Sequence, residues 1–330
     1  MRSTSNALDP DLIREAVAIL RRGGLVAFPT ETVYGLGADA SNPAAVARLY
    51  RVKGRPPDHP VIVHIADAAL LARWARDVPE SATKLAARFW PGPLTMVLRR
   101  APNVGDFLTG GQDTIGLRVP SHPVALQLLQ QFSRDDDGRR LIGVAAPSAN
   151  RFGRISPTTA EHVRDDLGDE VDLILDGGPC EIGIESTIVD LSGGRVVLLR
   201  PGRIGADEME AMLRVETRLK DRDAPRAPGT LESHYAPRHP LRLVPSAQWD
   251  EALHGAAPAR GVLSFRSRPA GLAGARWIEA SKNPQQYARD LYANLRTLDA
   301  SGCDEILVEE PPESGEWSAV RDRLVRARSA

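Results

Sequence analysis

Residues 186–199 read S-T-I-V-D-L-S-G-G-R-V-V-L-L and contain two apolar strand candidates, Ser186–Leu191 and Val196–Leu199. Only residues 192–195 lie between them. A connection this short has no room for the crossover helix that joins parallel strands. The pair therefore predicts a sheet that is not purely parallel.

Apolar runs on the N-terminal side of this pair alternate irregularly with helical patterns. Further strand candidates are Leu25–Phe28, Val61–Ile65, Leu94–Leu98, Thr114–Val119, Leu141–Ala145 and Val171–Leu175. Helices are expected from Pro10 to Gly23, from Pro43 to about Val52, and near residues 68–76, 82–89, 123–132 and 159–167. The pattern predicts an α/β domain over residues 1–214, with a mixed, twisted sheet flanked by helices.

The chain changes character after residue 214. Residues 215–240 are charged, contain Pro225, Pro228, Pro237 and Pro240, and lack apolar periodicity, so we expect an extended linker. Residues 241–330 again alternate strands and helices and predict a smaller, Rossmann-like α/β domain. Its expected elements are strands at 241–244, 261–265, 277–278 and 305–308, and helices at 247–253, 284–300 and 317–327.

Composition narrows the class of protein. Of the 330 residues 42% are hydrophobic and 26% are charged, which provides a core and argues against disorder. The apolar runs are too short to span a bilayer, and the polar N-terminus does not resemble a signal peptide. Cys180 and Cys303 cannot build a disulfide framework or a CxxC metal site, so we expect no metal site and a reducing cytoplasm.

The charge balance argues against a nucleic-acid footprint. The net charge is −1, and the halves before and after residue 205 are each nearly neutral. Of the 42 basic residues 38 are arginines, so a lysine at a pocket-like position, such as Lys53, is of more interest than usual.

Two nucleotide motifs can be set aside. Residues 35–40 match the loose dinucleotide fingerprint G-x-G-x-x-A. Residues 29–34 separate it from the preceding strand, and the next helix begins too late, at Asn42-Pro43. No P-loop motif is present.

Two polar clusters follow predicted elements. Lys53 and Arg55 leave a helix that Pro56 ends, so both could converge on one polyphosphate; alternatively they only complement the helix dipole. Ser148 and Asn150 follow the strand 141–145, where α/β ligands usually bind, although an ordinary turn would also use them.

Three further polar positions are less specific. Arg118 lies within an apolar strand run and needs a partner, which could be a substrate carboxylate. His64 lies in another run, where a satisfied core histidine is the commoner case. His234-Tyr235 in the linker is unusual, because exposed aromatic residues in such segments tend to dock on another surface.

Taken together, these stretches resemble the Sua5/YrdC family. The matching motifs, in order, are F-P-T-E-T-V-Y-G-L at 28–36, K-G-R-P at 53–56, P-G-P-L-T at 91–95, A-P-S-A-N at 146–150 and E-S-T at 185–187. The linker sequence H-Y-A-P at 234–237 and the C-terminal α/β segment resemble the two-domain Sua5 branch. The resemblance thus covers nearly the whole chain.

The resemblance implies an L-threonylcarbamoyladenylate synthase, a nucleotidyltransferase. Such an enzyme converts L-threonine, bicarbonate or CO₂, and ATP to threonylcarbamoyl-AMP and pyrophosphate. The product serves modification of adenosine 37 of tRNA through a separate threonylcarbamoyl transferase, so contact with tRNA is expected to be indirect and no membrane is involved.

By motif position, the resemblance also implies site residues. Lys53, Arg55, Ser148 and Asn150 would take part in catalysis, with Arg55 and Ser148 also contacting ATP. Further ATP contacts would be His59, Thr114, Ser156, Arg200 and Tyr235, with Tyr235 making the linker a lid. Threonine would be held by Thr32, His64, Arg118, Ala146 and Ser186.

Mg²⁺ is expected with ATP, carried by the nucleotide, since no carboxylate cluster marks a protein-built site. No organic cofactor is expected. Two alternatives remain open from the sequence: an RNA-binding module of the same fold, and a carbamoyladenylate-forming maturation factor. The second alternative usually has zinc-finger cysteine pairs, which this chain lacks.

Overall fold

The computed structural model describes residues 9–134, 141–219, 224–229, 234–254, 259–270 and 275–328. It contains two compact units. The first comprises Met1–Phe152, Pro157–Glu181 and Glu185–Thr230, and the second comprises Gly153–Ser156, Ile182–Ile184 and Leu231–Ala330. The boundaries that the sequence predicts, at residues 214 and 240, remain a prediction.

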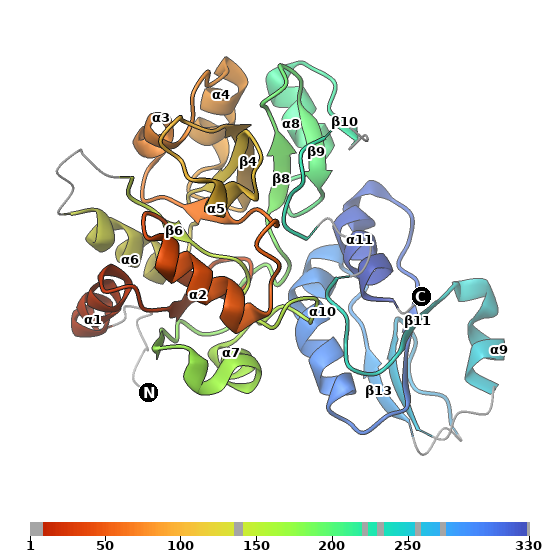
Figure 1. Cartoon of the computed structure of the whole chain (residues 1–330). Coiled ribbons are helices and arrows are strands. Elements are labelled where there is room, and N and C mark those ends of the chain that lie inside the picture. The colour runs from red at the N-terminus through yellow and green to blue at the C-terminus, as the bar shows by residue number, and fades with distance from the viewer. Residues whose placement is uncertain are drawn as a thin grey trace, which may run out of the picture. The chain divides into compact units, whose positions relative to one another are not determined.

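The first unit is built on a mixed sheet with the strand order β10-β9-β8-β4-β5-β3-β6-β2-β1-β7 (Figure 1). β8 and β9, the pair quoted above, are antiparallel, whereas β3 and β5 are parallel, so the predicted mixed α/β class is confirmed. The strands are β1 Val26–Phe28, β2 Gly35–Asp39, β3 Ile62–His64, β4 Leu94–Arg99, β5 Thr114–Arg118, β6 Val144–Ala145, β7 Leu173–Ile174, β8 Thr187–Asp190, β9 Val197–Arg200 and β10 Arg218–Leu219.

The first two helices of the first unit begin at capping side chains. The Asp9 side chain accepts the Asp11 N–H at the start of α1, and Asn42 caps α2 in the same way. The expected helix near 68–76 is instead a 3₁₀ turn at Ala68–Leu70 followed by the four-residue α3. The helices are α1 Pro10–Arg21, α2 Pro43–Lys53, α3 Leu71–Trp74, α4 Glu80–Phe89, α5 Asp106–Thr109, α6 Pro123–Ser133, α7 Ala160–Leu167 and α8 Ala206–Leu213, with a second 3₁₀ turn at Gly168–Glu170.

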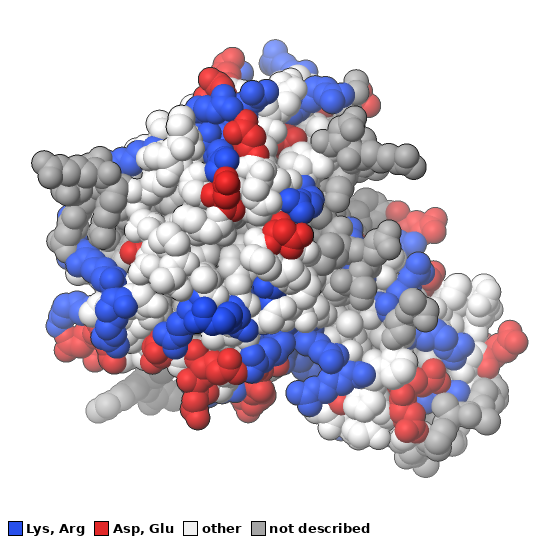
Figure 2. Space-filling model, viewed as in Figure 1, with Lys and Arg blue, Asp and Glu red and all other residues white. Residues whose placement is uncertain are grey.

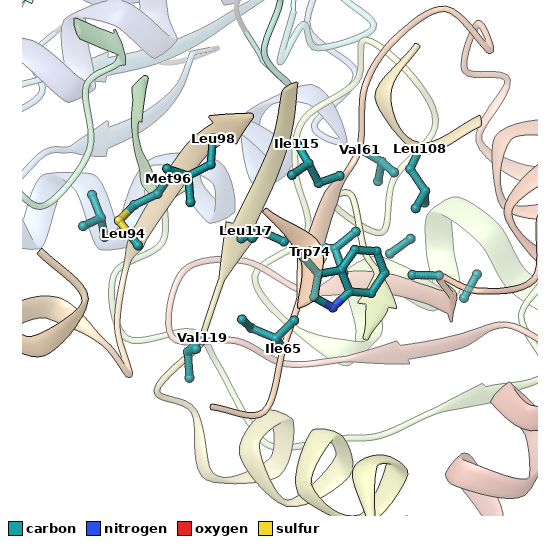
Figure 3. Close-up of a cluster of buried hydrophobic side chains, with 14 of the residues drawn as sticks. Val61, Ile65, Trp74, Leu94, Met96, Leu98, Leu108, Ile115, Leu117 and Val119 are labelled. Atoms are coloured by element: carbon teal, nitrogen blue, oxygen red, sulfur yellow. The ribbon is translucent and has the colours of Figure 1, made fainter. Parts of the chain in front are cut away.

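The central strands β3, β4 and β5 have two different faces. Figure 3 shows one of them, where side chains of β4 and β5 and of the residues flanking β3 belong to the hydrophobic core that also contains Trp74. These core residues alternate along each strand, as at Leu94, Met96 and Leu98 of β4. The residues between them therefore face the other side, and that side includes the candidate site.

Two strands were missing from the sequence-based prediction. β2 pairs with β1 and β6. It occupies most of residues 35–40, the segment that matches the dinucleotide fingerprint. A Cβ at Gly37 would lie 2.8 Å from both Phe28 and Val144, so this glycine allows close packing of the strand and does not mark a phosphate loop. β10 lies in the segment expected to be linker and pairs in parallel with β9.

The second unit confirms the predicted Rossmann-like arrangement. Its four strands are all parallel, in the order β11-β14-β12-β13. The long helix α10 buries an apolar stripe that includes Leu291, Leu295 and Leu298. The elements are β11 Leu241–Val244, α9 Trp249–His254, β12 Arg260–Ser264, β13 Arg276–Glu279, α10 Pro284–Asp299, β14 Glu305–Glu309 and α11 Ser318–Ala327, with 3₁₀ turns at Ser246–Gln248 and Gly315–Trp317.

A search for membrane-spanning elements found none among the helices of the described residues. On the face shown in Figure 2, the basic and acidic side chains that are described lie interspersed, as the near-zero net charge suggests.

Candidate active site

The candidate site begins with the face of the central strands opposite the hydrophobic core. Thr114, Gly116 and Arg118 of β5 alternate with core residues, and His64 of β3 is the direct strand partner of Arg118. Arg118 and His64 are 4% and 3% exposed. Alternation within strands therefore brings two predicted threonine-binding residues together on one buried polar surface.

Arg118 has a partner that the sequence did not identify. Its Nη2 lies 2.7 Å from Glu31 Oε1, and its Nε donates to the Gly92 carbonyl at 3.3 Å. Glu31 Oε2 also accepts the Ser121 N–H at 3.0 Å. The requirement that a charge in an apolar strand be paired is confirmed, and Glu31 of the P-T-E-T motif satisfies it.

His64 is held as a neutral imidazole. Burial lowers its pKa well below the ordinary value, and the positive charge of Arg118 lowers it further. Its Nδ1 is buried without a hydrogen-bond partner among the described residues. An unpaired buried ring nitrogen beside an arginine is suited to accept or donate one hydrogen bond to a polar ligand.

The loop between β1 and β2 supplies Thr32, which is fully buried. Its hydroxyl lies 2.8 Å from that of Thr30, and the Thr30 hydroxyl also accepts the Thr32 and Val33 N–H groups. This compact turn fixes both Thr32 and the neighbouring Glu31. Ala146 follows β6, and its N–H donates to the Ile62 carbonyl beside β3.

Lys53 ends α2, because Gly54 adopts the left-handed conformation at φ 65° and turns the chain. The Lys53 ammonium is buried and donates to the carbonyls of Ser148 and Asn150, each at 2.5 Å. Burial, and then the charge of Arg55, lowers its pKa well below the ordinary value. Lys53 therefore fastens the 146–150 loop to the end of α2, which the sequence alone did not predict.

Arg55 lies on the same loop exit. Its Nη2 donates to the Pro60 carbonyl at 2.6 Å, and its guanidinium lies over the rings of Tyr50 and Phe152, at 5.9 and 5.7 Å from their centroids. The half-buried His59 meets the edge of the same Phe152 ring. Burial and the Arg55 charge lower the pKa of His59, so its ring is neutral at pH 7.

Ser186 and Arg200 are in direct contact. The Ser186 hydroxyl lies 2.8 Å from the Thr95 hydroxyl and 3.1 Å from Arg200 Nη2. Arg200 also donates to the Ser186 carbonyl from Nε and Nη2. A residue predicted to bind threonine and one predicted to bind ATP therefore share one buried hydrogen-bond network, with Thr95 as a member that the sequence missed.

Part of the predicted linker packs on this polar face. The Pro228 carbonyl accepts from Arg200 Nη1 at 2.9 Å, and Ala227 joins an apolar cluster that includes Ile62 and Ile188. Gln112 is paired twice with the backbone of Arg226, at 3.1 and 2.7 Å. A small cavity remains beneath this segment; its lining includes Thr95, Thr114, Gly116, Arg226 and Pro228.

Ser156 and Tyr235 belong to the second unit and are each at most 1% exposed. Tyr235 has a positive φ of 65°, and its ring packs near Tyr292 and beneath the Arg323 guanidinium, 5.4 Å from the ring centroid. Its role as a lid over the nucleotide stays a prediction, as do the ligand contacts inferred for the other site residues.

The arrangement offers two sets of groups joined by one loop. The Lys53 ammonium holds residues 146–150 at the Ser148 and Asn150 carbonyls, and at the other end of this loop the Ala146 N–H donates to Ile62 of β3, the strand that carries His64. Among the described residues no cluster of three or more acidic, histidine or cysteine side chains could hold a metal ion. The buried cations and hydrogen-bonding groups of this site can stabilise negative charge and position a ligand.

Comparison with known proteins is consistent with these motifs. A family model described as "Telomere recombination" (Sua5/YciO/YrdC) matches residues 18–202, and a model of the threonylcarbamoyl-AMP synthase C-terminal domain matches residues 204–329. Curated relatives named threonylcarbamoyl-AMP synthase include one from Pyrococcus abyssi, 40% identical over 96% of this chain and 93% of its own length, and one from Bacillus subtilis, 40% identical over 97% and 93%.

A solved structure, Pyrococcus abyssi Sua5 complexed with L-threonine, is similar throughout. Its TM-score is 0.86 at 39% sequence identity, covering 97% of this chain and 95% of that one. The match covers nearly the whole chain, as the two family models do together. This chain therefore belongs to the Sua5 family of threonylcarbamoyl-AMP synthases.

Proposed function

We propose that this chain forms threonylcarbamoyl-AMP and pyrophosphate from L-threonine, bicarbonate or CO₂, and ATP, as a nucleotidyltransferase. The observation that best supports this function is the 146–150 loop, because Lys53 holds its Ser148 and Asn150 carbonyls, while the Ala146 N–H at its other end donates to Ile62 of β3. Strand β3 carries His64, which pairs with Arg118. One short segment thus spans the places proposed for the nucleotide and for the amino acid.

The amino acid would occupy the pocket of Arg118, His64, Thr32 and Ser186, with the backbone of Ala146 at its edge. Arg118 would bind the threonine carboxylate, because a buried guanidinium prefers an anionic partner. The neutral His64 ring, whose Nδ1 has no partner among the described residues, would bind a polar group of threonine. The pocket would hold the amine where CO₂ can add to give the carbamate.

The carbamate oxygen would then attack the α-phosphorus of ATP, with pyrophosphate as the leaving group. Negative charge grows on the phosphate oxygens in this step, so oriented cations lower the barrier. Arg55 would provide this charge directly, and Lys53 would contribute by fixing the loop of Ser148 and Asn150. His59, Thr114, Ser156, Arg200 and Tyr235 would complete the ATP contacts. Burial protects the labile carbamate from water.

Mg²⁺ would enter the site bound to the phosphates of ATP. Glu31, a buried carboxylate of this region, is already engaged by Arg118 and the Ser121 N–H, so it is not free to bind a metal ion, and we expect the nucleotide to carry the ion. The ion would supply charge neutralisation at the β- and γ-phosphates. We propose no organic cofactor.

The product would reach tRNA through a separate threonylcarbamoyl transferase. Interspersed surface charge and a net charge of −1 favour this reading over an RNA-binding module (Figure 2). A full-length relation to threonylcarbamoyl-AMP synthases favours it over a maturation factor. We place the reaction in the cytoplasm, where the buried free thiols Cys180 and Cys303 would stay reduced.

The test is pyrophosphate release from ATP by the purified protein. We expect release only when L-threonine and bicarbonate are both present, together with a threonine-dependent AMP adduct in the product mixture. Release that needs neither substrate, or none under any condition, would contradict the proposal. Tight tRNA binding at physiological salt without ATP or threonine would favour the RNA-binding alternative.

A further inference from the structure

Glu31 is a buried carboxylate beside Arg118 that has no direct part in the proposed reaction. It is 4% exposed and lies between Thr30 and Thr32, whose hydroxyls hydrogen-bond to each other. Its carboxylate has two partners: Oε1 meets Arg118 Nη2 at 2.7 Å, and Oε2 accepts the Ser121 N–H at 3.0 Å. The second bond ties Glu31 to the backbone just beyond the end of β5.

The Arg118 guanidinium is thereby held at two of its three nitrogens. Nη2 is bound by Glu31, and Nε donates to the Gly92 carbonyl at 3.3 Å. The structure gives Nη1 no hydrogen-bond partner among the described residues. Because a guanidinium is planar, fixing Nε and Nη2 also fixes the direction in which the Nη1 N–H bonds point.

We propose that Glu31 is a positioning residue that orients Arg118 so that Nη1 is presented to the carboxylate of the amino-acid substrate. The inference rests on the proposed function, since it takes Arg118 as the carboxylate ligand. Glu31 does not touch the substrate itself. It holds a flexible, buried arginine in one conformation before threonine binds, and this lowers the conformational entropy that binding would otherwise lose.

Glu31→Ala is the decisive variant. Without the carboxylate, Arg118 loses its Nη2 partner and its fixed plane, so the KM for L-threonine should rise about tenfold or more, as expected when an oriented charge-assisted bond is lost. The KM for ATP should stay within about twofold, because no described contact of Glu31 involves a predicted ATP ligand. The measurement is pyrophosphate release with each substrate varied in turn.

Glu31→Gln tests the same point with less change in shape. Its amide oxygen can still accept from Arg118, but its NH₂ group would face the Ser121 N–H. We expect a smaller rise in the KM for threonine than in Glu31→Ala. This variant also keeps the proposal testable if Glu31→Ala does not fold.

Asp172→Ala is the matched control within the same unit. Asp172 accepts from Arg48 Nη1 and Nη2 at 2.6 and 3.1 Å and from the Leu25 N–H at 2.7 Å, so it too joins an arginine to the backbone, but away from the pocket. Its loss should lower the thermal unfolding temperature and leave both KM values unchanged.

An unchanged or lower KM for threonine in both Glu31 variants would overturn the inference, and so would equal rises in the two KM values. These results leave the proposed function standing if the unmodified protein still releases pyrophosphate in a threonine-dependent manner. Absence of that dependence in the unmodified protein would instead contradict the proposed function itself.

Discussion

Glu31 in the first unit and Glu309 in the second are both 4% exposed, and both contact an arginine. Glu309 accepts four hydrogen bonds: the Ser264 and Ser246 hydroxyls at 2.6 and 2.9 Å, the Phe265 N–H at 3.0 Å and Arg266 Nε at 3.2 Å. These donors come from the ends of the parallel strands β11 and β12, where many α/β proteins bind ligands.

The surroundings of the two carboxylates differ. In the second unit Glu309 is supplied with four donors from its own neighbourhood, although the buried Tyr287 hydroxyl of that unit has no hydrogen-bond partner among the described residues. In the first unit polar groups such as His64 Nδ1 and Arg118 Nη1 have no partner among the described residues. The comparison suggests that a saturated polar cluster stabilises the fold, whereas an incomplete one is available to substrates.

Among the tests of this comparison between the two units, we expect the largest effect from substitution of Lys53. Lys53→Ala should lower the rate of pyrophosphate release by roughly 100- to 1,000-fold, because the loop carrying Ser148 and Asn150 loses its anchor beside the phosphates. Lys53→Arg should not restore the rate, since a planar guanidinium cannot replace an ammonium that meets two carbonyls. Rates close to those of the unmodified protein would show that Lys53 is only a helix end. Circular dichroism checks that the variants are folded.

Removing Glu309, the acceptor of the polar cluster in the second unit, should lower stability and leave activity unchanged. Glu309→Ala leaves several donors without an acceptor, and we expect the free energy of unfolding to fall by about 2 kcal/mol. The KM values for threonine and ATP should not change. Urea unfolding and steady-state kinetics measure the two effects, and a selective rise in either KM would remove the proposed contrast between the units.

The same cluster predicts a pH dependence. Hydrogen bonds from Ser264 and Ser246 lead the causes that hold the pKa of Glu309 below its ordinary value of 4.5, against the opposing effect of burial. A depressed pKa in the folded state means that this contribution to stability is complete above pH 4.5 and is lost as the pH falls through the folded-state pKa. Glu309→Gln should flatten the acid limb of the stability profile, and an unaltered limb would assign it to other groups.

Thr95→Val is a milder change within the incomplete set. Valine keeps the shape but removes the hydroxyl that lies beside Ser186. We expect the KM for threonine to rise roughly fivefold, because Ser186 would be less firmly oriented. Thr187→Val serves as the control, since the Thr187 hydroxyl bonds to the Ile204 backbone instead. An equal response of both variants would indicate a general packing effect.

Tyr235→Phe is expected to have the smallest effect. It preserves the ring packing near Tyr292 and Arg323 and removes only the hydroxyl. If Tyr235 closes over the nucleotide through that group, the KM for ATP should rise roughly threefold with no change in thermal stability. An unchanged KM would leave Tyr235 as an anchor of the linker on the second unit.

The sequence predicted most elements because their signals are local. The first two helices begin at Pro10 and Pro43, as expected, and the short link between β8 and β9 correctly indicated a mixed sheet. β2 was missed because all five of its residues are buried, so no alternation of polar and apolar residues marks it. β10 is a two-residue strand that depends on β9 for its pairing.

The sequence indicated candidate site residues, whose ligand contacts stay predictions, but it did not indicate the contacts among them. The position of Arg118 in an apolar run indicated that its charge must be paired. Nothing in the sequence links it to Glu31, 87 positions away. Likewise, phosphate binding by the K-x-R motif stays a prediction, but the sequence did not indicate that the Lys53 ammonium donates to backbone carbonyls. Such contacts are set by tertiary folding. Thr95 could have been recognised as a site residue because it is the one hydroxyl residue among the apolar residues of β4.

The alternation along β5 also constrains how this chain can change in length. Inserting or deleting one residue between Thr114 and Arg118 would exchange the two faces, placing the guanidinium of Arg118 in the hydrophobic cluster and Leu117 in the pocket. A two-residue change would preserve the faces but would separate Arg118 from His64 and Glu31. Strand β5 should therefore tolerate substitutions far better than the insertion or deletion of one or two residues. Length variation among relatives should be confined to the loops.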